Sequence, residues 1–246
     1  MKRRKSNEIN SLDVIQGALF MLLALAMVAF IASGRYVNYV TPRTVPYVLV
    51  AVFVLASFAI ASFCGTFHTS VNALGKIMVV LIVPTLMLVI PVQTSSASSE
   101  GLNRAIAVSG SASTRLSGLD ASKRTITISD DQFGAWYDRI DRNSNQYLGY
   151  TIVLNGFVSQ DSSVGASQFT ASRMLMTCCV LDMTSFGFVV DAGTSRIPKD
   201  DSWVTVTGTL AKGTIGTKSH SYQGLVLSGA KIASSTDTAS GYFYYQ

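Results

Sequence analysis

Two adjacent cysteines, Cys178 and Cys179, are the residues of this chain with the clearest capacity for chemistry. Adjacent thiols can bind a soft metal ion, form a strained vicinal disulfide in an oxidising exterior, or fill apolar volume. Neighbouring side chains of a regular strand point to opposite faces, so both sulfurs reach one ion only if the strand ends or bends there. Together with Asp182 and His220, the pair would supply two thiolates, a carboxylate and an imidazole, which are ligands that zinc accepts.

We favour a structural role for the cysteine pair, in which one side chain is buried and the other is a disulfide partner or a free thiol. The pair lacks the CxxC spacing that is typical of zinc sites. A thioredoxin-type redox role is disfavoured because no residues separate the cysteines and no helix N-terminus follows to lower a thiol pKa. Cys64, at the end of an apolar run, is expected to be unrelated.

The remaining charged residues show no arrangement of nucleophile, base and orienting group, so we expect no enzyme. Arg173 lies within a predicted strand and is expected to form a structural ion pair with Asp182 or Asp191. A group of carboxylates lies at the start and on the polar side of a predicted helix, where the helix dipole and solvation explain them. These residues are Asp130, Asp131, Asp138 and Asp141.

Short strand patterns separated by turn residues surround these positions and predict a small, mainly β domain with an OB-like barrel. The predicted strands are Thr125 to Ile128, Tyr150 to Val158, Phe169 to Cys178, Phe188 to Asp191, Trp203 to Lys212 and Leu225 to Ile232. Within the fifth of these, valines and Leu210 alternate with threonines, as expected for a half-buried strand. Gly156, Gly208 and Gly229 lie inside strand patterns and indicate bulges or bends. Tyr242 to Tyr245 is expected to dock on the barrel as a last strand or a clasp, in preference to resting at a membrane interface.

One amphipathic helix is predicted before the second strand. Phe133, Trp136, Tyr137 and Ile140 recur at helical spacing, and Ser129 with Gln132 resembles a capping box. Because helical spacing already accounts for the aromatic residues, we expect them to pack on the sheet and not to stack on a ligand.

Three apolar runs in the first part of the chain predict transmembrane helices at about 14–33, 45–63 and 77–92. A cleaved signal peptide is disfavoured for the first run because it is too long and two further runs follow it. Lys2, Arg3, Arg4 and Lys5 should remain in the cytoplasm. Three spans then place the C-terminal domain outside the cell membrane, whereas two spans would place it in the cytoplasm.

The chain is thus expected to contain a membrane region over residues 1–92, a flexible Ser/Ala/Gly-rich linker over 93–123 and the β domain over 124–246. A short helix at Leu102 to Val108 is an alternative inside the linker. The 246 residues include 48% hydrophobic and 13% charged residues, and the net charge of +5 comes partly from the N-terminal cluster. This charge favours contact with the lipid bilayer over nucleic acid, and the basic stripe with interleaved aromatics that nucleic-acid binding needs is missing.

Several residues give the chain a resemblance to the YcgQ-like family of bacterial two-part membrane proteins. They are Tyr39, Pro42 and Arg43 between the first two runs; Gly149, Gly156 and Phe157 at the start of the barrel; and Arg173, Cys178, Cys179 and Asp182. Two apolar residues, Val180 and Leu181, precede Asp182 where family members more often have a small residue next to it. The His-rich stretch of many members is also missing, since His68 and His220 are the only histidines.

The resemblance implies that the protein is an accessory subunit of a polytopic membrane permease, with its outer β domain capping or gating the partner. The cysteine pair itself suggests an alternative of another class, a metal- or thiol-dependent binding module, and the resemblance adds an association with zinc. In that alternative, the Cys178–Cys179 pair captures an ion, zinc in particular, outside the membrane. No other cofactor is expected.

Overall fold

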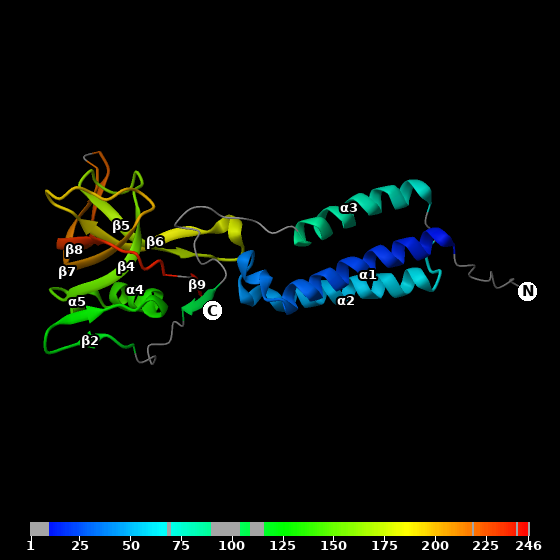
Figure 1. Cartoon of the computed structure of the whole chain (residues 1–246), viewed down its shortest axis with the longest axis horizontal. Coiled ribbons are helices and arrows are strands. Elements are labelled where there is room, and N and C mark those ends of the chain that lie inside the picture. Colours follow the sequence, from blue (N-terminus) through cyan, green and yellow to red (C-terminus); the bar gives the residue numbers. More distant parts are fainter. Residues whose placement is uncertain are drawn as a thin grey trace, which may run out of the picture. The chain divides into compact units, whose positions relative to one another are not determined.

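A computed structural model describes residues 10–67, 70–89, 104–108, 116–217, 219–239 and 241–245 of the chain. The chain divides into two compact units, Met1–Gln93 and Thr94–Gln246. Figure 1 shows that the first unit is helical and that the second contains the strands.

The N-terminal unit is built from three long helices. They are α1 (Ser11–Ala32), α2 (Val45–Phe63) and α3 (Val71–Val89), and the short turns η1 (Arg35–Asn38) and η2 (Pro42–Thr44) join the first two. Each long helix has the length and apolar composition needed to cross a membrane, which confirms that all three apolar runs are helices of this kind. The third begins at Val71, earlier than predicted, and the predicted end at residues 90–92 lies outside the described residues.

Helix α1 packs against both α2 and α3. Its Gly17 allows a close approach to α2, because a Cβ atom there would lie 2.8 Å from the ring of Phe63. One turn further along, the rings of Phe20 and Phe58 stack with centroids 5.8 Å apart. These contacts hold α1 and α2 together as a pair.

Most of the apolar surface of the helices remains uncovered. Each of these helices contains an apolar stretch of 18 residues. Only 22%, 6% and 11% of this stretch is buried in α1, α2 and α3. Phe53 on α2 is 74% exposed and Met87 on α3 is 68% exposed. In water such surface would be costly, so these faces are suited to lipid or to further apolar helices.

The C-terminal unit is mainly β, as predicted, and both of its α-helices lie between β3 and β4. Its strands are β1 (Ala105–Val108), β2 (Leu119–Asp120), β3 (Thr125–Thr127), β4 (Thr151–Ser159), β5 (Gln168–Leu175), β6 (Thr184–Asp191), β7 (Trp203–Gly216), β8 (Ser221–Ser234) and β9 (Tyr242–Tyr245). The helical elements are η4 (Asp130–Gln132), α4 (Phe133–Arg142), α5 (Ser144–Tyr147) and η5 (Val180–Asp182).

Five central strands form a closed ring of pairings. Strand β4 pairs antiparallel with both β5 and β7, and β5 continues through β6 and β8 to β7. Within this ring, β6 and β8 are parallel and the other pairs are antiparallel. Outside it, β3 and β2 extend the sheet from β4, and β9 and β1 extend it from β5. The terminal segment is therefore a strand, as predicted.

Strand β7 shows the predicted alternation. Val204, Val206 and Leu210 are buried, whereas Thr205 and Thr207 are half-buried and Thr209 is exposed. The register between β7 and β8 shifts between Thr207 and Thr209. This confirms the predicted irregularity at Gly208, because a glycine fits a bulge without a side chain to displace.

Helix α4 covers the core with the predicted face. Phe133, Trp136 and Ile140 are at most 1% exposed, and Tyr137 packs edge-on against Phe188 with ring centroids 5.3 Å apart. The aromatic stripe is therefore packed on the sheet, as expected from its spacing.

The predicted capping box is wrong. Residues 130–132 form a 3-10 turn, and the Ser129 side chain makes no capping bond. Gln132 instead accepts hydrogen bonds from the backbone N–H and hydroxyl of Ser117, both at 2.9 Å. A distant segment thus competes successfully for the side chain that local sequence assigned to the helix end.

Two parts of the predicted 93–123 linker belong to the sheet. Ala105–Val108 is not a helix but strand β1, which pairs parallel with β9. Leu119 and Asp120 pair with β3, and the Ser117 carbonyl accepts a 2.9 Å bond from the Trp136 indole. These short segments gain order from long-range partners that composition does not reveal. Residues 93–103 and 109–115 lie outside the described residues.

Candidate functional site

The loop between β5 and β6 brings Cys178, Cys179 and Asp182 together. Their potential ligand atoms, two sulfurs and a carboxylate oxygen, all lie within 4.8 Å of one another. Strand β5 ends at Leu175 and not at Cys178 as predicted. Because the cysteines follow the strand end, the rule that neighbouring side chains point to opposite faces no longer separates them.

Asp182 holds this loop in shape through its carboxylate. The carboxylate accepts backbone N–H bonds from Thr177 at 3.0 Å, Cys178 at 2.7 Å and Cys179 at 3.4 Å. In return, the Cys179 sulfur accepts the N–H of Asp182, which completes a capping box around η5. A carboxylate three residues after the second cysteine is therefore what folds the turn.

Apolar side chains hold the cysteine loop against strand β9 and the end of β5. Val180 and Met183 pack with the buried Met176, Tyr242 and Tyr244. Between these anchors, Leu181 is 93% exposed at the tip. The docking of β9 therefore positions the cysteines, although it is far from them in sequence.

The Cys178 thiol is protonated at neutral pH. Its hydrogen bond to Asp182, together with one to Cys179, raises its pKa from 9.0 to about 11. Partial desolvation raises the pKa of Asp182, but hydrogen bonds from Cys178 and from the backbone outweigh it, so that this pKa is below its ordinary value. The site is thus a thiol beside a carboxylate, and a metal ion would have to displace the thiol proton.

The donor set fits a thiophilic metal ion with three protein ligands. Cys178 is exposed and the other two residues are half-buried, so an ion has access from solvent. Three ligands leave a fourth position open, unlike the closed sites that serve structure alone.

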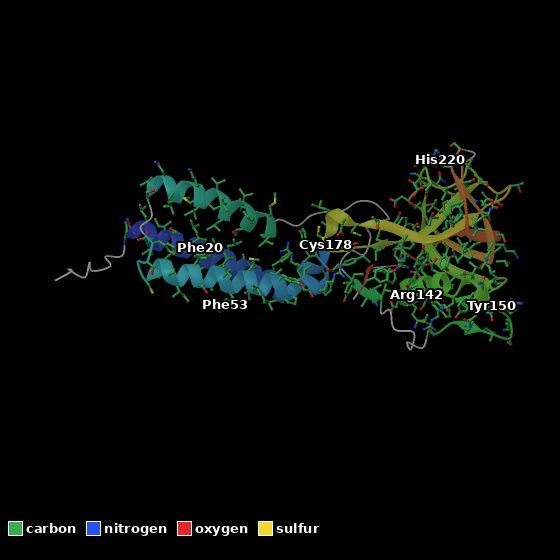
Figure 2. All side chains as sticks on the ribbon, turned by 180° about the vertical axis from the view of Figure 1, so that it is seen from behind. Phe20, Phe53, Arg142, Tyr150, Cys178 and His220 are labelled. Atoms are coloured by element: carbon green, nitrogen blue, oxygen red, sulfur yellow. The ribbon has the colours of Figure 1, made fainter. Side chains whose placement is uncertain are left out.

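The structure separates His220 from this group, and it agrees with the prediction for the cysteine pair only in part. His220 lies in the turn between β7 and β8, and Figure 2 shows it in a different part of the β domain from Cys178. Strands β5 and β7 are both antiparallel to β4, so the cysteine loop and the turn with His220 follow the same end of the strands. The histidine is nevertheless remote because β6 and β8 pair only at Val189–Val226 and Val190–Leu227 and diverge before these residues. None of the three cysteines forms a disulfide, and neither Cys178 nor Cys179 is fully buried. Cys178 and Cys179 are thiols without a disulfide, which was one of the expected alternatives, but neither is the buried side chain that we expected.

Arg173 is a second unusual residue of the same strand. It is 1% exposed and pairs with Asp130 at 3.0 Å, and not with Asp182 or Asp191 as predicted. Its guanidinium also lies over the rings of Phe133, Trp203 and Phe243, with the central carbon 5.7, 5.4 and 5.6 Å from the centroids. Burial lowers its pKa, against the attraction of Asp130. The ion pair is therefore structural, as predicted, with a different partner.

The other residues that carried the family resemblance have structural positions. Gly149 has a φ of +77°, a conformation that favours glycine. Gly156 allows a close approach of β5, because a Cβ there would lie 3.0 Å from backbone atoms of Ser172. Phe157 packs edge-on against Trp203 at 5.9 Å.

Three residues of the family resemblance, Tyr39, Pro42 and Arg43, belong to the helical unit. They lie in the connection between α1 and α2. Tyr39 follows η1 and contacts Phe30 at 5.4 Å, and Pro42 begins η2. Arg43 is the middle residue of η2. None of the three lies in the unit that holds the cysteine loop.

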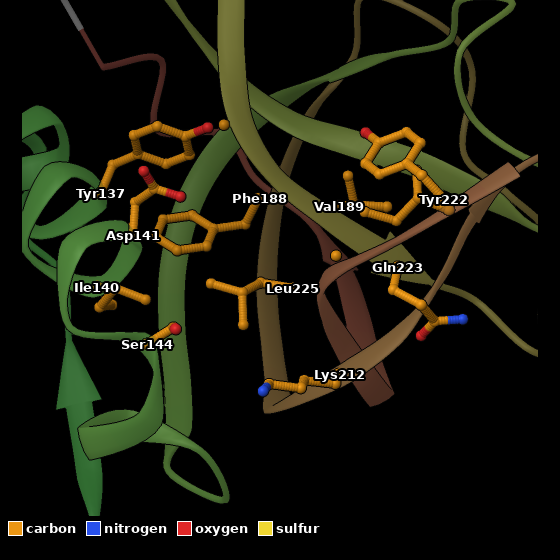
Figure 3. A pocket seen from close by; sticks show the side chains of 13 residues that line it. Tyr137, Ile140, Asp141, Ser144, Phe188, Val189, Lys212, Tyr222, Gln223 and Leu225 are labelled. Atoms are coloured by element: carbon orange, nitrogen blue, oxygen red, sulfur yellow. The ribbon is translucent and has the colours of Figure 1, made fainter.

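A pocket of about 520 Å³ in the β domain was not predicted. It lies between α4 and α5 on one side and β6, β7 and β8 on the other, as Figure 3 shows. Its residues come from four separated stretches of the chain, and no local motif unites them. The nearest signal in the sequence is the aromatic stripe of α4, which was assigned entirely to the core.

Comparisons with known proteins agree with the resemblance. The family described as DUF1980 C-terminal domain matches residues 108–245. The UPF0703 protein YcgQ of Bacillus subtilis (strain 168) is 30% identical over 91 residues, which make up 37% of this chain and 32% of YcgQ. The match thus spans about a third of that relative. No solved structure matches the chain significantly. These descriptions name no enzymatic activity, and they show that the chain belongs to the YcgQ-like family that carries the DUF1980 C-terminal domain.

Proposed function

We propose that this protein is a membrane-anchored accessory subunit of a polytopic permease. The observation that carries the proposal is the uncovered apolar surface of α1, α2 and α3. In α2, for example, only 6% of the apolar stretch of 18 residues is buried. Three helices this open are poorly suited to forming a pore among themselves. They are well suited to packing against lipid on one side and the helices of a larger protein on another.

An apolar groove offers a place for such a helix. It has a volume of about 510 Å³ and is lined by residues of all three helices and of η1. Met27 and Ile31 of α1, Val48 of α2 and Met87 of α3 are among the residues that line it. Tyr36 and Tyr39 also line the groove, which is consistent with an interfacial position for this end.

Orientation in the proposal follows the positive N-terminus. With Lys2 to Lys5 in the cytoplasm and three spans, the β domain lies outside the plasma membrane. The ring of pairings among β4, β5, β6, β8 and β7 supports assigning this domain to the OB-like barrels. Its role is to cap or gate the outer mouth of the partner.

Photo-crosslinking in native membranes tests the accessory role. A photoreactive residue replaces Met87, which lines the groove, or Phe53, which is 74% exposed and does not line it. We expect a crosslinked permease from position 87 and mainly lipid adducts from position 53.

A second comparison uses a chain that ends after Val92, which should no longer crosslink to the permease if the β domain contributes to recognition. Crosslinks to lipid alone at both positions would contradict the proposal.

A second function is favoured by one observation, the clustering of Cys178, Cys179 and Asp182 within 4.8 Å. In this proposal the loop captures a metal ion, such as zinc, outside the membrane and passes it on through the open coordination position. The ion would be held by the two sulfurs and one carboxylate oxygen.

Metal binding to the purified full chain tests the second function. We expect one zinc per chain, lost in the Cys178→Ser variant and retained in the Cys64→Ser variant, since Cys64 follows the end of α2. Binding that is equal in both variants would place the ion elsewhere. The two proposals are separable because a Cys178→Ser chain should still crosslink to the permease.

A further inference from the structure

We propose that the gap between β6 and β8 binds an extended peptide segment of another protein, which adds a strand to the sheet. The gap coincides with the 520 Å³ pocket, whose lining includes Gly187 and Phe188 of β6 and Tyr222 to Leu225 of β8. This site lies in the β domain alone, and it depends neither on the permease proposal nor on the cysteine loop.

The strand edges around the gap are unpaired. Strands β6 and β8 pair only at Val189 with Val226 and at Val190 with Leu227. Before these residues, β6 is paired only with β5 and β8 only with β7. Alternate backbone N–H and C=O groups on the two facing edges therefore have no ladder partner among the described residues. Facing unpaired edges are the feature that an extended peptide recognises by strand addition.

The pocket between these edges has an apolar floor. Ile140, Phe188 and Leu225 lie on it, and the rings of Tyr137 and Tyr222 stand on its opposite sides (Figure 3). Tyr222 is 58% exposed, so its ring is available for contact. Since side chains of a bound strand alternate between two sides, every second residue of the peptide would enter the pocket and should be apolar.

Two charges at the rim define the rest of the ligand. Asp141 of α4 and Lys212 of β7 line the pocket and are exposed. Neither forms an ion pair within the part of the chain that the structure describes. A peptide with a basic side chain near Asp141 and an acidic one near Lys212 would complement both. A compact small molecule would occupy the floor but would leave the strand edges unpaired, which is why we assign a peptide.

Selection from a library of random eight-residue peptides tests the site on the full chain in lipid nanodiscs. We expect enriched sequences to alternate apolar and polar residues and to carry both charges. Adding a synthetic enriched peptide should slow amide hydrogen exchange in Gly187–Phe188 and Gly224–Leu225, because new backbone hydrogen bonds form there. If no peptide is enriched over empty nanodiscs, or if exchange at these edges is unchanged, the proposal is wrong.

Two controls identify the mode of binding. The same peptide with N-methylated backbone amides should lose binding, and equal binding would indicate side-chain recognition only, against strand addition. The double variant Asp141→Lys, Lys212→Glu should bind the parent peptide about tenfold more weakly. Lys231→Glu, an exposed position of β8 outside the pocket, should change the affinity by less than about twofold. Equal losses in the double variant and in Lys231→Glu would contradict the assigned charges.

Discussion

Arg173 and Asp130 form an ion pair at 3.0 Å across 43 positions of sequence, and the arginine is almost completely buried whereas the carboxylate is one-third exposed. The pair joins strand β5 to the turn that precedes α4. It therefore links the strand leading into the cysteine loop with the helix that covers the core.

Removing the carboxylate of this pair should destabilise the β domain. Asp130→Asn leaves the Arg173 charge buried without its partner, and we expect a loss of about 3 kcal/mol in the free energy of unfolding. The neighbouring Asp131 pairs with Arg104 at the surface, so Asp131→Asn should cost less than about 1 kcal/mol. Tryptophan fluorescence during thermal unfolding measures both, because Trp136 and Trp203 both lie in this domain. Equal effects would show that burial does not distinguish the two pairs.

The reactivity of Cys178 should depend on Asp182. The Asp182→Asn variant removes the negative charge that keeps the thiol protonated, so we expect alkylation by iodoacetamide at pH 8 to become at least about tenfold faster. In the unaltered chain the rate should keep rising toward the pKa of about 11. Peptide mass spectrometry resolves the rate at each cysteine, with Cys64 as the internal reference. An unchanged rate in the variant would show that the carboxylate does not control the thiol.

Stability should respond to the same thiol at high pH. A thiol pKa that is higher in the folded than in the unfolded state stabilises the fold below the ordinary value of 9.0, and this contribution is lost as the pH rises toward 11. Between pH 8 and pH 11, the midpoint temperature of thermal unfolding should therefore fall less steeply for the Cys178→Ser variant than for the unaltered chain. Parallel curves for the two proteins would argue against this linkage.

Close packing at Gly134 should make this position intolerant of a side chain. A Cβ atom there would lie 2.6 Å from Val108 and 2.8 Å from Phe243, so Gly134→Ala should cost about 1–3 kcal/mol by overpacking. Gly75 in α3 has no atom within 4 Å of such a Cβ, and Gly75→Ala should be neutral. The midpoint temperature of thermal unfolding is measured for both variants and for the unaltered chain. An unchanged midpoint in Gly134→Ala would mean that β1 and β9 shift to accommodate the methyl group.

The side of the membrane on which the β domain lies can be read by thiol labelling. In a chain whose three cysteines are serines, Lys231→Cys places one exposed thiol in the domain. We expect a membrane-impermeant maleimide to label it in intact cells. Labelling only after permeabilisation would put the domain in the cytoplasm and reverse the proposed orientation.

Local patterns predicted the elements whose order depends on nearby residues. The predictions were correct for the three apolar runs, the aromatic face of α4 and the alternation in β7. A continuous apolar run, or apolar residues that recur with a period of 3.6 or 2, can be recognised from neighbouring residues alone. The predictions failed where a distant partner decided the outcome. Strand β1 exists because β9 pairs with it, and the Gln132 side chain turns toward Ser117 instead of capping its helix.

For the candidate site, the sequence by itself determined that two thiols and a carboxylate lie within five residues, and hence which chemistry is available. Only the tertiary structure decided that β5 ends before Cys178, that His220 is remote and that Arg173 pairs with Asp130. It also decided that β6 and β8 separate beside α4 to leave a pocket. The physical reason is that ligand geometry and strand pairing join residues far apart in the chain, whereas sequence patterns report on neighbours.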